Sequence, residues 1–147
     1  MVNVLTSLDL EQLIKQNKID NFNGVFSKDL FPTNFKKGWY IINLQDHDEG
    51  SGTHFTCLKI TDEKVNIYFD SYNAPAPNMI SEKIKPYFYS DKQIQDKISS
   101  ACGWFCIACI KYVEEHNHVG DVLAFKDFIN GFSKNTNYND SILKRYL

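Results

Sequence analysis

The stretch that decides the fold runs from Ser99 to Glu115 and reads SSACGWFCIACIKYVEE. Apolar side chains occupy almost every position from 103 to 113, without the polar stripe that is typical of a surface helix. The stretch therefore predicts a helix that is buried in the middle of the domain and begins at about Gly103. Cys102 stands at the mouth of this helix, where the positive end of the helix dipole lowers the pKa of a thiol and favours the thiolate.

The other cysteines of the helix have a simpler interpretation. Cys106 and Cys109 lie on the same helical face as Cys102 but deeper, and a free cysteine is most often a small buried apolar residue. Their spacing, Cys102-x3-Cys106-x2-Cys109, also matches the iron–sulfur ligands of radical enzymes, but the intervening aromatic and aliphatic residues favour a buried helix. Three of the four cysteines fall within eight residues, which suits a helix better than a disulfide framework. A reducing, intracellular setting is therefore expected.

Two strand candidates precede the helix, over residues 54–60 and 64–70. A three-residue hairpin loop at 61–63 would place His54 directly opposite Asp70, with their Cβ atoms roughly 5 Å apart. A carboxylate at that distance is placed to hydrogen-bond the imidazole, fix its tautomer and stabilise the imidazolium. The alternative is a cross-strand pair that only stabilises the hairpin.

Strands in the middle of the chain and helices toward both ends predict an α+β fold. The length of 147 residues fits one domain, 1–147. The remaining expected elements are a capped amphipathic helix beginning at about Thr6, irregular chain over 21–32, a buried strand over 39–44, an acidic loop over 46–52, turns over 71–77, a short helix over 78–86, mixed strand character over 87–94 and a last helix that Asp121 caps and that runs to about residue 130.

Sixteen basic and eighteen acidic residues leave a net charge of −2. This balance gives no general attraction to polyanions, so DNA binding is not indicated by charge. Four lysines, at positions 83, 85, 92 and 97, are interpreted as a solvated face. No apolar run approaches the length needed to cross a bilayer, and no secretory signal is evident, so no membrane contact is expected.

A zinc site using His116, His118 and a cysteine is a second metal alternative. A helix C-terminus, whose negative dipole end favours histidines, is the simpler interpretation of the same residues. His47 is placed in a solvated loop. We therefore expect neither a metal nor another cofactor.

Gln95 lies seven residues before Cys102, in a polar segment that leads to the helix. Its amide is placed to donate to the oxyanion of a tetrahedral intermediate, beside the backbone N–H of Cys102. A preorganised donor of this kind is worth on the order of 3 kcal/mol in the transition state. Gln93 is a competitor for this role, and a glutamine in a polar segment is most often only a surface residue.

Taken together, these elements resemble the adenovirus-type (adenain-like) maturation proteases of DNA viruses, virophages and maverick-type elements. They are also similar to the wider clan that includes SUMO-deconjugating proteases. The resemblance covers about residues 22–110, in the order His, acid, Gln, Cys. The motifs that carry it are Phe22–Pro32, Gly52-Thr53-His54-Phe55, Tyr68-Phe69-Asp70-Ser71-Tyr72, Gln95 and Ala101-Cys102-Gly103-Trp104-Phe105-Cys106.

The resemblance implies a central mixed sheet packed against a buried helix with the nucleophilic cysteine at its N-terminus. It further implies a thiol endopeptidase in which Cys102 is the nucleophile, His54 the general base, Asp70 its partner and Gln95 an oxyanion donor. The implied substrates are capsid or virion precursor polypeptides with small residues, often glycine, near the scissile bond. The implied setting is the host cell, in a virus factory or the nucleus, or the virion itself. The alternative is a deconjugating protease for a SUMO- or ubiquitin-like modifier.

The sequence departs from the family pattern in three places. Phe55 stands where a tryptophan commonly follows the histidine. Asp70 replaces the glutamate of adenoviral members and matches the deconjugases. No cysteine lies between positions 58 and 94, so the thiol that tethers the activating peptide of adenoviral members has no counterpart. Neither that peptide nor activating DNA is therefore expected as a cofactor.

Overall fold

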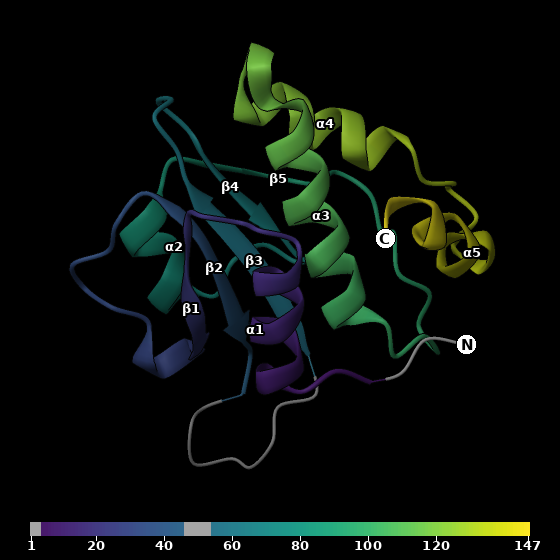
Figure 1. Ribbon diagram of the computed structural model, residues 1–147, viewed down its shortest axis with the longest axis horizontal. Coiled ribbons are helices and arrows are strands. Elements are labelled where there is room, and N and C mark those ends of the chain that lie inside the picture. The colour runs from purple at the N-terminus through teal and green to yellow at the C-terminus, as the bar shows by residue number, and fades with distance from the viewer. Residues whose placement is uncertain (1–3, 46–53) are drawn as a thin grey trace.

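The computed structural model describes residues 4–45 and 54–147. Its helices and strands are α1 (Ser7–Gln16), β1 (Phe22–Ser27), β2 (Gly38–Asn43), β3 (Phe55–Ile60), β4 (Asn66–Phe69), α2 (Asn78–Ile84), β5 (Tyr87–Tyr89), α3 (Cys102–His116), α4 (Asp121–Asn130) and α5 (Asn139–Leu143). The five strands form one mixed sheet in the order β1-β2-β3-β4-β5 (Figure 1). The outer pairs, β1–β2 and β4–β5, are parallel, and the inner pairs are antiparallel. The expected α+β fold with a central mixed sheet is confirmed.

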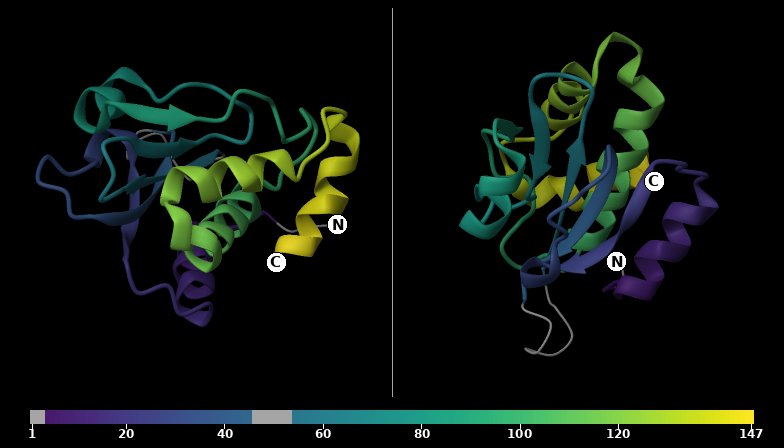
Figure 2. Two further views of the ribbon diagram at one scale, coloured as in Figure 1. Left: turned by 90° about the horizontal axis from the view of Figure 1, so that it is seen from above. Right: turned by 90° about the vertical axis from the view of Figure 1, so that its left-hand side faces the viewer.

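Helices cover both faces of the sheet, with α2 on one face and α1, α3 and α4 on the other (Figure 2). The side chains of β2 alternate between the two layers. Trp39 and Ile41 belong to the core under α3, whereas Tyr40 and Ile42 belong to the core under α2. Successive side chains of a strand point to opposite faces, so a sheet that is covered on both sides needs strands that are apolar throughout.

Helix α3 lies at the centre of the larger core, as its apolar sequence predicts. It begins at Cys102, and most of its side chains as far as Val113 are buried against the sheet, α1 and α4. Gly103 allows this close packing at the start of the helix. A Cβ atom added to Gly103 would lie only 3.2 Å from the Cβ of Leu5 and 3.3 Å from a methyl carbon of Leu10.

The expectation of irregular chain over residues 21–32 is wrong for its first half. Phe22–Ser27 form β1, a parallel strand at the edge of the sheet, and all six residues are half-buried. The strand lacks the alternation that identifies a strand in a sequence, because neither of its faces is fully covered. It is also irregular: the pairing register shifts between Phe22 and Val25, and Gly24 has a φ of 134°, which favours glycine.

The hairpin between β3 and β4 has a different register from the one expected. Leu58 pairs with Tyr68, so paired residue numbers sum to 126, and the loop contains five residues, 61–65, instead of three. Thr61 stabilises the longer loop, because its hydroxyl donates to the carbonyl of Val65 at 2.8 Å and its backbone N–H donates to the Asn66 side chain at 3.0 Å. The predicted direct pairing across the hairpin is therefore wrong by two residues.

Other boundaries agree more closely with the expectations. The capping box of α1 is present, with Thr6 and Asp9 exchanging hydrogen bonds of 2.9 and 3.1 Å. Helix α4 ends at Asn130 as expected, but Asp121 is its first residue and not its cap, because its carboxylate binds Lys59. Helix α2 ends at Ile84, before the expected residue 86, because the residue that precedes Pro86 disfavours the helical conformation. Strand β5 covers only three residues of the segment from 87 to 94.

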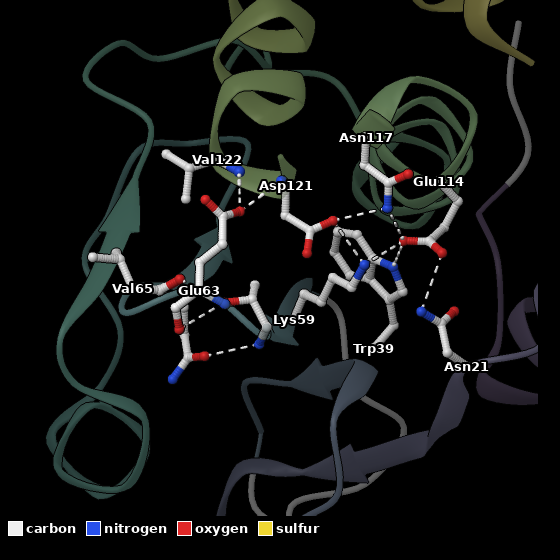
Figure 3. Close-up of polar contacts among 11 residues, drawn as sticks. Asn21, Trp39, Lys59, Glu63, Val65, Glu114, Asn117, Asp121 and Val122 are labelled. Atoms are coloured by element: carbon white, nitrogen blue, oxygen red, sulfur yellow. Dashed lines mark hydrogen bonds and ion pairs between the residues drawn. The ribbon is translucent and has the colours of Figure 1, made fainter. Parts of the chain in front are cut away.

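A buried charged network lies at the end of β3 that leads into the hairpin loop (Figure 3). Lys59, whose side chain is 8% exposed, donates to Glu114 at 2.6 Å and to Asp121 at 2.8 Å. Glu114 also accepts hydrogen bonds from the Trp39 indole at 3.0 Å and from the Asn21 amide at 3.1 Å. The network thereby joins β2, β3 and the residue before β1 to the last turn of α3 and the first residue of α4.

The acidic loop over 46–52, with His47 and the Gly52-Thr53 part of the histidine motif, lies outside the described residues. Within 4–45 and 54–147, no helix combines the length and apolar composition needed to cross a membrane.

Candidate active site

Three of the predicted site residues lie at the ends of secondary-structure elements. His54 immediately precedes β3, Asp70 immediately follows β4, and Cys102 is the first residue of α3. His54 Nε2 lies 2.8 Å from Asp70 Oδ1, and the imidazole also hydrogen-bonds the Cys102 thiol. The structure thus brings the three side chains together at the end of the sheet where α3 begins.

The two-residue error in the hairpin register does not separate His54 from Asp70. Continuing the observed register places His54 opposite Tyr72, and the two rings lie 4.9 Å apart between centroids. Asp70 is then the diagonal neighbour of His54. A shift by an even number of residues keeps side chains on the same face of the sheet, so the carboxylate remains within reach of the ring.

Asp70 is held in place by its surroundings. It is 3% exposed, and its Oδ1 atom accepts a second hydrogen bond, 2.9 Å long, from the backbone N–H of Tyr72. Because Nε2 of His54 binds Asp70, Nδ1 is the ring nitrogen that remains for the thiol of Cys102. The carboxylate therefore selects the tautomer and the orientation of the ring.

The electrostatics favour an ion pair between Cys102 and His54. Burial acts to lower the pKa of His54, but hydrogen bonds with Asp70 and Cys102 outweigh it and raise the pKa to about 9. Burial acts to raise the pKa of Cys102, but hydrogen bonds from His54 and from the backbone of Phe55 and Gly103 outweigh it, so the pKa is lowered. The position of Cys102 at the helix N-terminus acts in the same direction.

Gln95 lies beside these residues but is fully buried and already bonded. Its Oε1 accepts from the Ser71 hydroxyl at 2.5 Å, and its Nε2 donates to the Ser99 carbonyl at 2.8 Å. An amide nitrogen carries two N–H groups, so Nε2 has one further N–H beyond the bond to Ser99. Gln93, the competitor for the same role, donates to the Gln95 backbone carbonyl at 2.9 Å.

The segment that carries Gln95 is braced by the last residues of the chain, for which the sequence suggested no role. The Asn139 amide donates to the Ile94 carbonyl at 2.8 Å. The Ser99 hydroxyl donates to both carboxylate oxygens of Asp140, at 2.9 and 3.0 Å. Helix α5 therefore fixes both ends of the Gln95 segment.

The other three cysteines and His116 have structural surroundings of their own. Cys57, Cys106 and Cys109 are fully buried, and burial raises the pKa of each thiol. The Cys106 thiol donates to the Phe55 carbonyl at 3.5 Å. His116 stacks on the Tyr112 ring at 4.0 Å in the last turn of α3.

The sequence reasoning missed several residues that shape the site. Ser71 and Tyr72 follow Asp70 directly, and Ser99 lies three residues before Cys102. All three fall within or beside the quoted motifs, and this proximity was the signal that could have found them. Asp140 carried no such signal, because it lies 41 residues from its partner Ser99.

No protein-family model matches the chain, and no curated protein matches it. A solved structure of AvrA, in a delL154 form with IP6 and CoA, resembles the chain with a TM-score of 0.44 and 16% sequence identity. The match covers 94% of this chain and 53% of that one, so this chain spans about half the length of the AvrA chain.

Proposed function

We propose that the protein is a cysteine endopeptidase with Cys102 as nucleophile, His54 as general base and acid, and Asp70 as the residue that orients the imidazole. The observation that supports this most directly is the position of the His54 ring, which bonds Asp70 through Nε2 and the Cys102 thiol on its other side. A sulfur nucleophile next to a base that is itself held by a third group is the arrangement of thiol catalysis.

In the first half of the reaction the Cys102 thiolate attacks the carbonyl carbon of the scissile peptide bond and forms a carbon–sulfur bond. The carbonyl oxygen becomes an oxyanion, for which the Cys102 backbone N–H and the second N–H of Gln95 Nε2 are the proposed donors. The His54 imidazolium then gives its proton to the departing amine. The carbon–nitrogen bond breaks and an acyl-thioester remains on Cys102.

In the second half, neutral His54 takes a proton from a water molecule that attacks the thioester carbonyl. The carbon–sulfur bond breaks, the carboxylic acid product leaves, and the thiolate–imidazolium pair is restored. The Asp70 carboxylate orients the ring and stabilises the imidazolium at the start and the end of the cycle.

We further propose that the substrates are capsid or virion precursor polypeptides cleaved next to small residues, often glycine, inside an infected cell or in the particle. This part rests on the sequence motifs shared with the adenovirus-type proteases. A deconjugating protease for a SUMO- or ubiquitin-like modifier is the second candidate, because Asp70 is the acid that such enzymes use.

The test is to incubate the protein with candidate precursor proteins, and in parallel with SUMO and ubiquitin conjugates, and to map new termini by mass spectrometry. We expect cleavage of the precursors, and we expect Cys102→Ala to reduce the rate by about 10⁵-fold or more, because the nucleophile is lost.

Cys109→Ala is the matched control, since it removes a thiol from the same helix at a position buried away from His54. It should cleave at a rate close to that of the unmodified protein. Equal cleavage by Cys102→Ala would assign the chemistry to other residues, and release of modifiers without precursor cleavage would favour the deconjugase.

A further inference from the structure

Tyr72 contacts several residues of the candidate site. Its ring lies against the His54 imidazole, with centroids 4.9 Å apart and planes inclined by 36°. Its backbone N–H donates to Asp70 Oδ1 at 2.9 Å, the same oxygen that His54 Nε2 approaches to 2.8 Å. One residue therefore contacts both members of the His–Asp pair.

The phenol of Tyr72 reaches the other half of the site. Its hydroxyl donates to the Ser99 carbonyl at 3.1 Å, and the same carbonyl accepts the Gln95 Nε2 amide at 2.8 Å. Ser99 is anchored in turn by Asp140. Tyr72 thus connects the residues that follow β4 with the segment that leads into α3.

The imidazole receives its aromatic neighbour from Tyr72 and not from the residue that follows it in the chain. The Phe55 side chain is 3% exposed and belongs to the core under α3. Tyr72 is only half-buried, at the surface of the site, where its removal costs the core little. Replacing Tyr72 therefore tests the contact with His54 without removing a residue of the core, whereas replacing Phe55 would also destabilise the fold.

We propose that Tyr72 is a positioning residue, whose ring keeps the His54 imidazole aligned between Asp70 and Cys102 and whose hydroxyl keeps the Gln95 segment in register with that ring. The role in turnover rests on the proposed function. The role in holding His54 beside Cys102 does not, because it concerns a contact that exists without substrate.

The experiment compares Tyr72→Leu, which removes the ring, with Tyr72→Phe, which removes only the hydroxyl. Tyr138→Phe is the matched control, because it removes a hydroxyl from a tyrosine that is 61% exposed. Each variant is first checked for folding by thermal unfolding.

The rate of iodoacetamide alkylation at Cys102 is then followed by mass spectrometry from about pH 5 to pH 10, because this rate reports the fraction of Cys102 that is thiolate. Hydrolysis of a fluorogenic peptide that ends in Gly-Gly-aminomethylcoumarin gives kcat and KM.

For Tyr72→Leu we expect the alkylation profile to move to higher pH and kcat to fall about 10- to 100-fold with KM nearly unchanged, because a misaligned base costs rate and not binding. For Tyr72→Phe we expect the alkylation profile of the unmodified protein and a fall in kcat of about 3- to 10-fold, the size of one lost hydrogen bond.

Each half of the proposal has its own contradicting result. A Tyr72→Leu protein that folds and keeps the original alkylation profile would show that the ring does not align His54. A Tyr72→Phe protein with unchanged kcat would show that the hydroxyl link has no role. If the alkylation shift appears as expected while the unmodified protein cleaves neither the peptide nor the precursor proteins, the proposed function fails and the positioning of His54 stands.

Discussion

His54 and Lys59 mark the two ends of β3, and each is a cation that joins the strand to α3. At the first end, His54 lies between Asp70 and Cys102, the first residue of the helix. At the second end, Lys59 lies between Asp121 and Glu114, which is in the last turn of the helix. The same strand and helix therefore carry a charged cluster at both ends, but only the His54 cluster contains a thiol.

The difference between the two clusters follows from the helix dipole and from the partners. The N-terminus of α3 stabilises a negative charge, so a thiol at Cys102 is helped to ionise. The C-terminus disfavours a carboxylate, and Glu114 is stabilised there by Lys59, whose pKa is raised above its usual value because hydrogen bonds to Asp121 and Glu114 outweigh its burial. The Lys59 cluster therefore joins elements of the fold through ion pairs and contains no nucleophile, whereas the charge on Cys102 depends on His54.

The largest effect is expected for a substitution in the His54 cluster. Asp70→Asn preserves the shape of the side chain but removes the charge that stabilises the His54 imidazolium. We expect kcat on the Gly-Gly peptide to fall by about 10²- to 10⁴-fold, as when the acid of a catalytic triad is neutralised. The alkylation profile of Cys102 should move to higher pH in the same protein, because the imidazolium that stabilises the thiolate is weakened.

Asp127→Asn is the control for this experiment, since Asp127 is an exposed carboxylate on α4. It should change neither quantity. An Asp70→Asn protein with ordinary turnover would show that the contact between Asp70 and His54 only stabilises the hairpin.

The next largest effect is expected for a substitution in the Lys59 cluster. Lys59→Met removes the cation and leaves Glu114 and Asp121 without their shared partner in a mostly buried site. We expect the free energy of unfolding, measured with urea, to fall by about 3–5 kcal/mol. Cys102 should still be alkylated at its ordinary rate below the unfolding transition.

Lys64→Met provides the comparison for a lysine that is exposed in the nearby hairpin loop, and it should cost at most about 0.5 kcal/mol. If Lys59→Met reduced the reactivity of Cys102 as strongly as Asp70→Asn does, the Lys59 cluster would influence the thiol as well as the stability of the fold, and the proposed difference between the two clusters would be wrong.

The sequence was most informative where structure is decided locally. The apolar run after Cys102 predicted a buried helix, and the Thr6–Asp9 pattern predicted a capping box, because both depend on residues within one or two turns. Hairpin register was less accessible, because the five-residue loop is stabilised by hydrogen bonds of the Thr61 side chain that no hydrophobic pattern reveals.

The site shows the same limit. His54 and Asp70 could be paired from the sequence because a two-residue shift in register leaves them on one face. The surroundings of Gln95 could not be predicted from the sequence, since they depend on Asn139 and Asp140, which are distant in the chain.

The smallest expected effect is a pH dependence that separates the two clusters without any substitution. Deprotonation of the His54 imidazolium, with a pKa of about 9, should halve kcat/KM near that pH, because the general acid is lost. Stability should change much less there. The raised pKa of His54 contributes stability that is lost as the pH rises from 6.5 through about 9, whereas the lowered pKa of Cys102 contributes stability that is gained as the pH rises toward the ordinary thiol value of 9.0, so the two contributions oppose each other. Lys59 has a raised pKa, so its contribution to the stability of the fold is complete below the ordinary value of 10.5 and is lost only as the pH rises through the raised value.

The measurement is kcat/KM and the thermal midpoint of the same sample from about pH 7 to pH 10. A midpoint that fell together with activity would mean that the loss reports unfolding, and an activity limb well below pH 9 would mean that Asp70 and Cys102 do not hold His54 as the imidazolium.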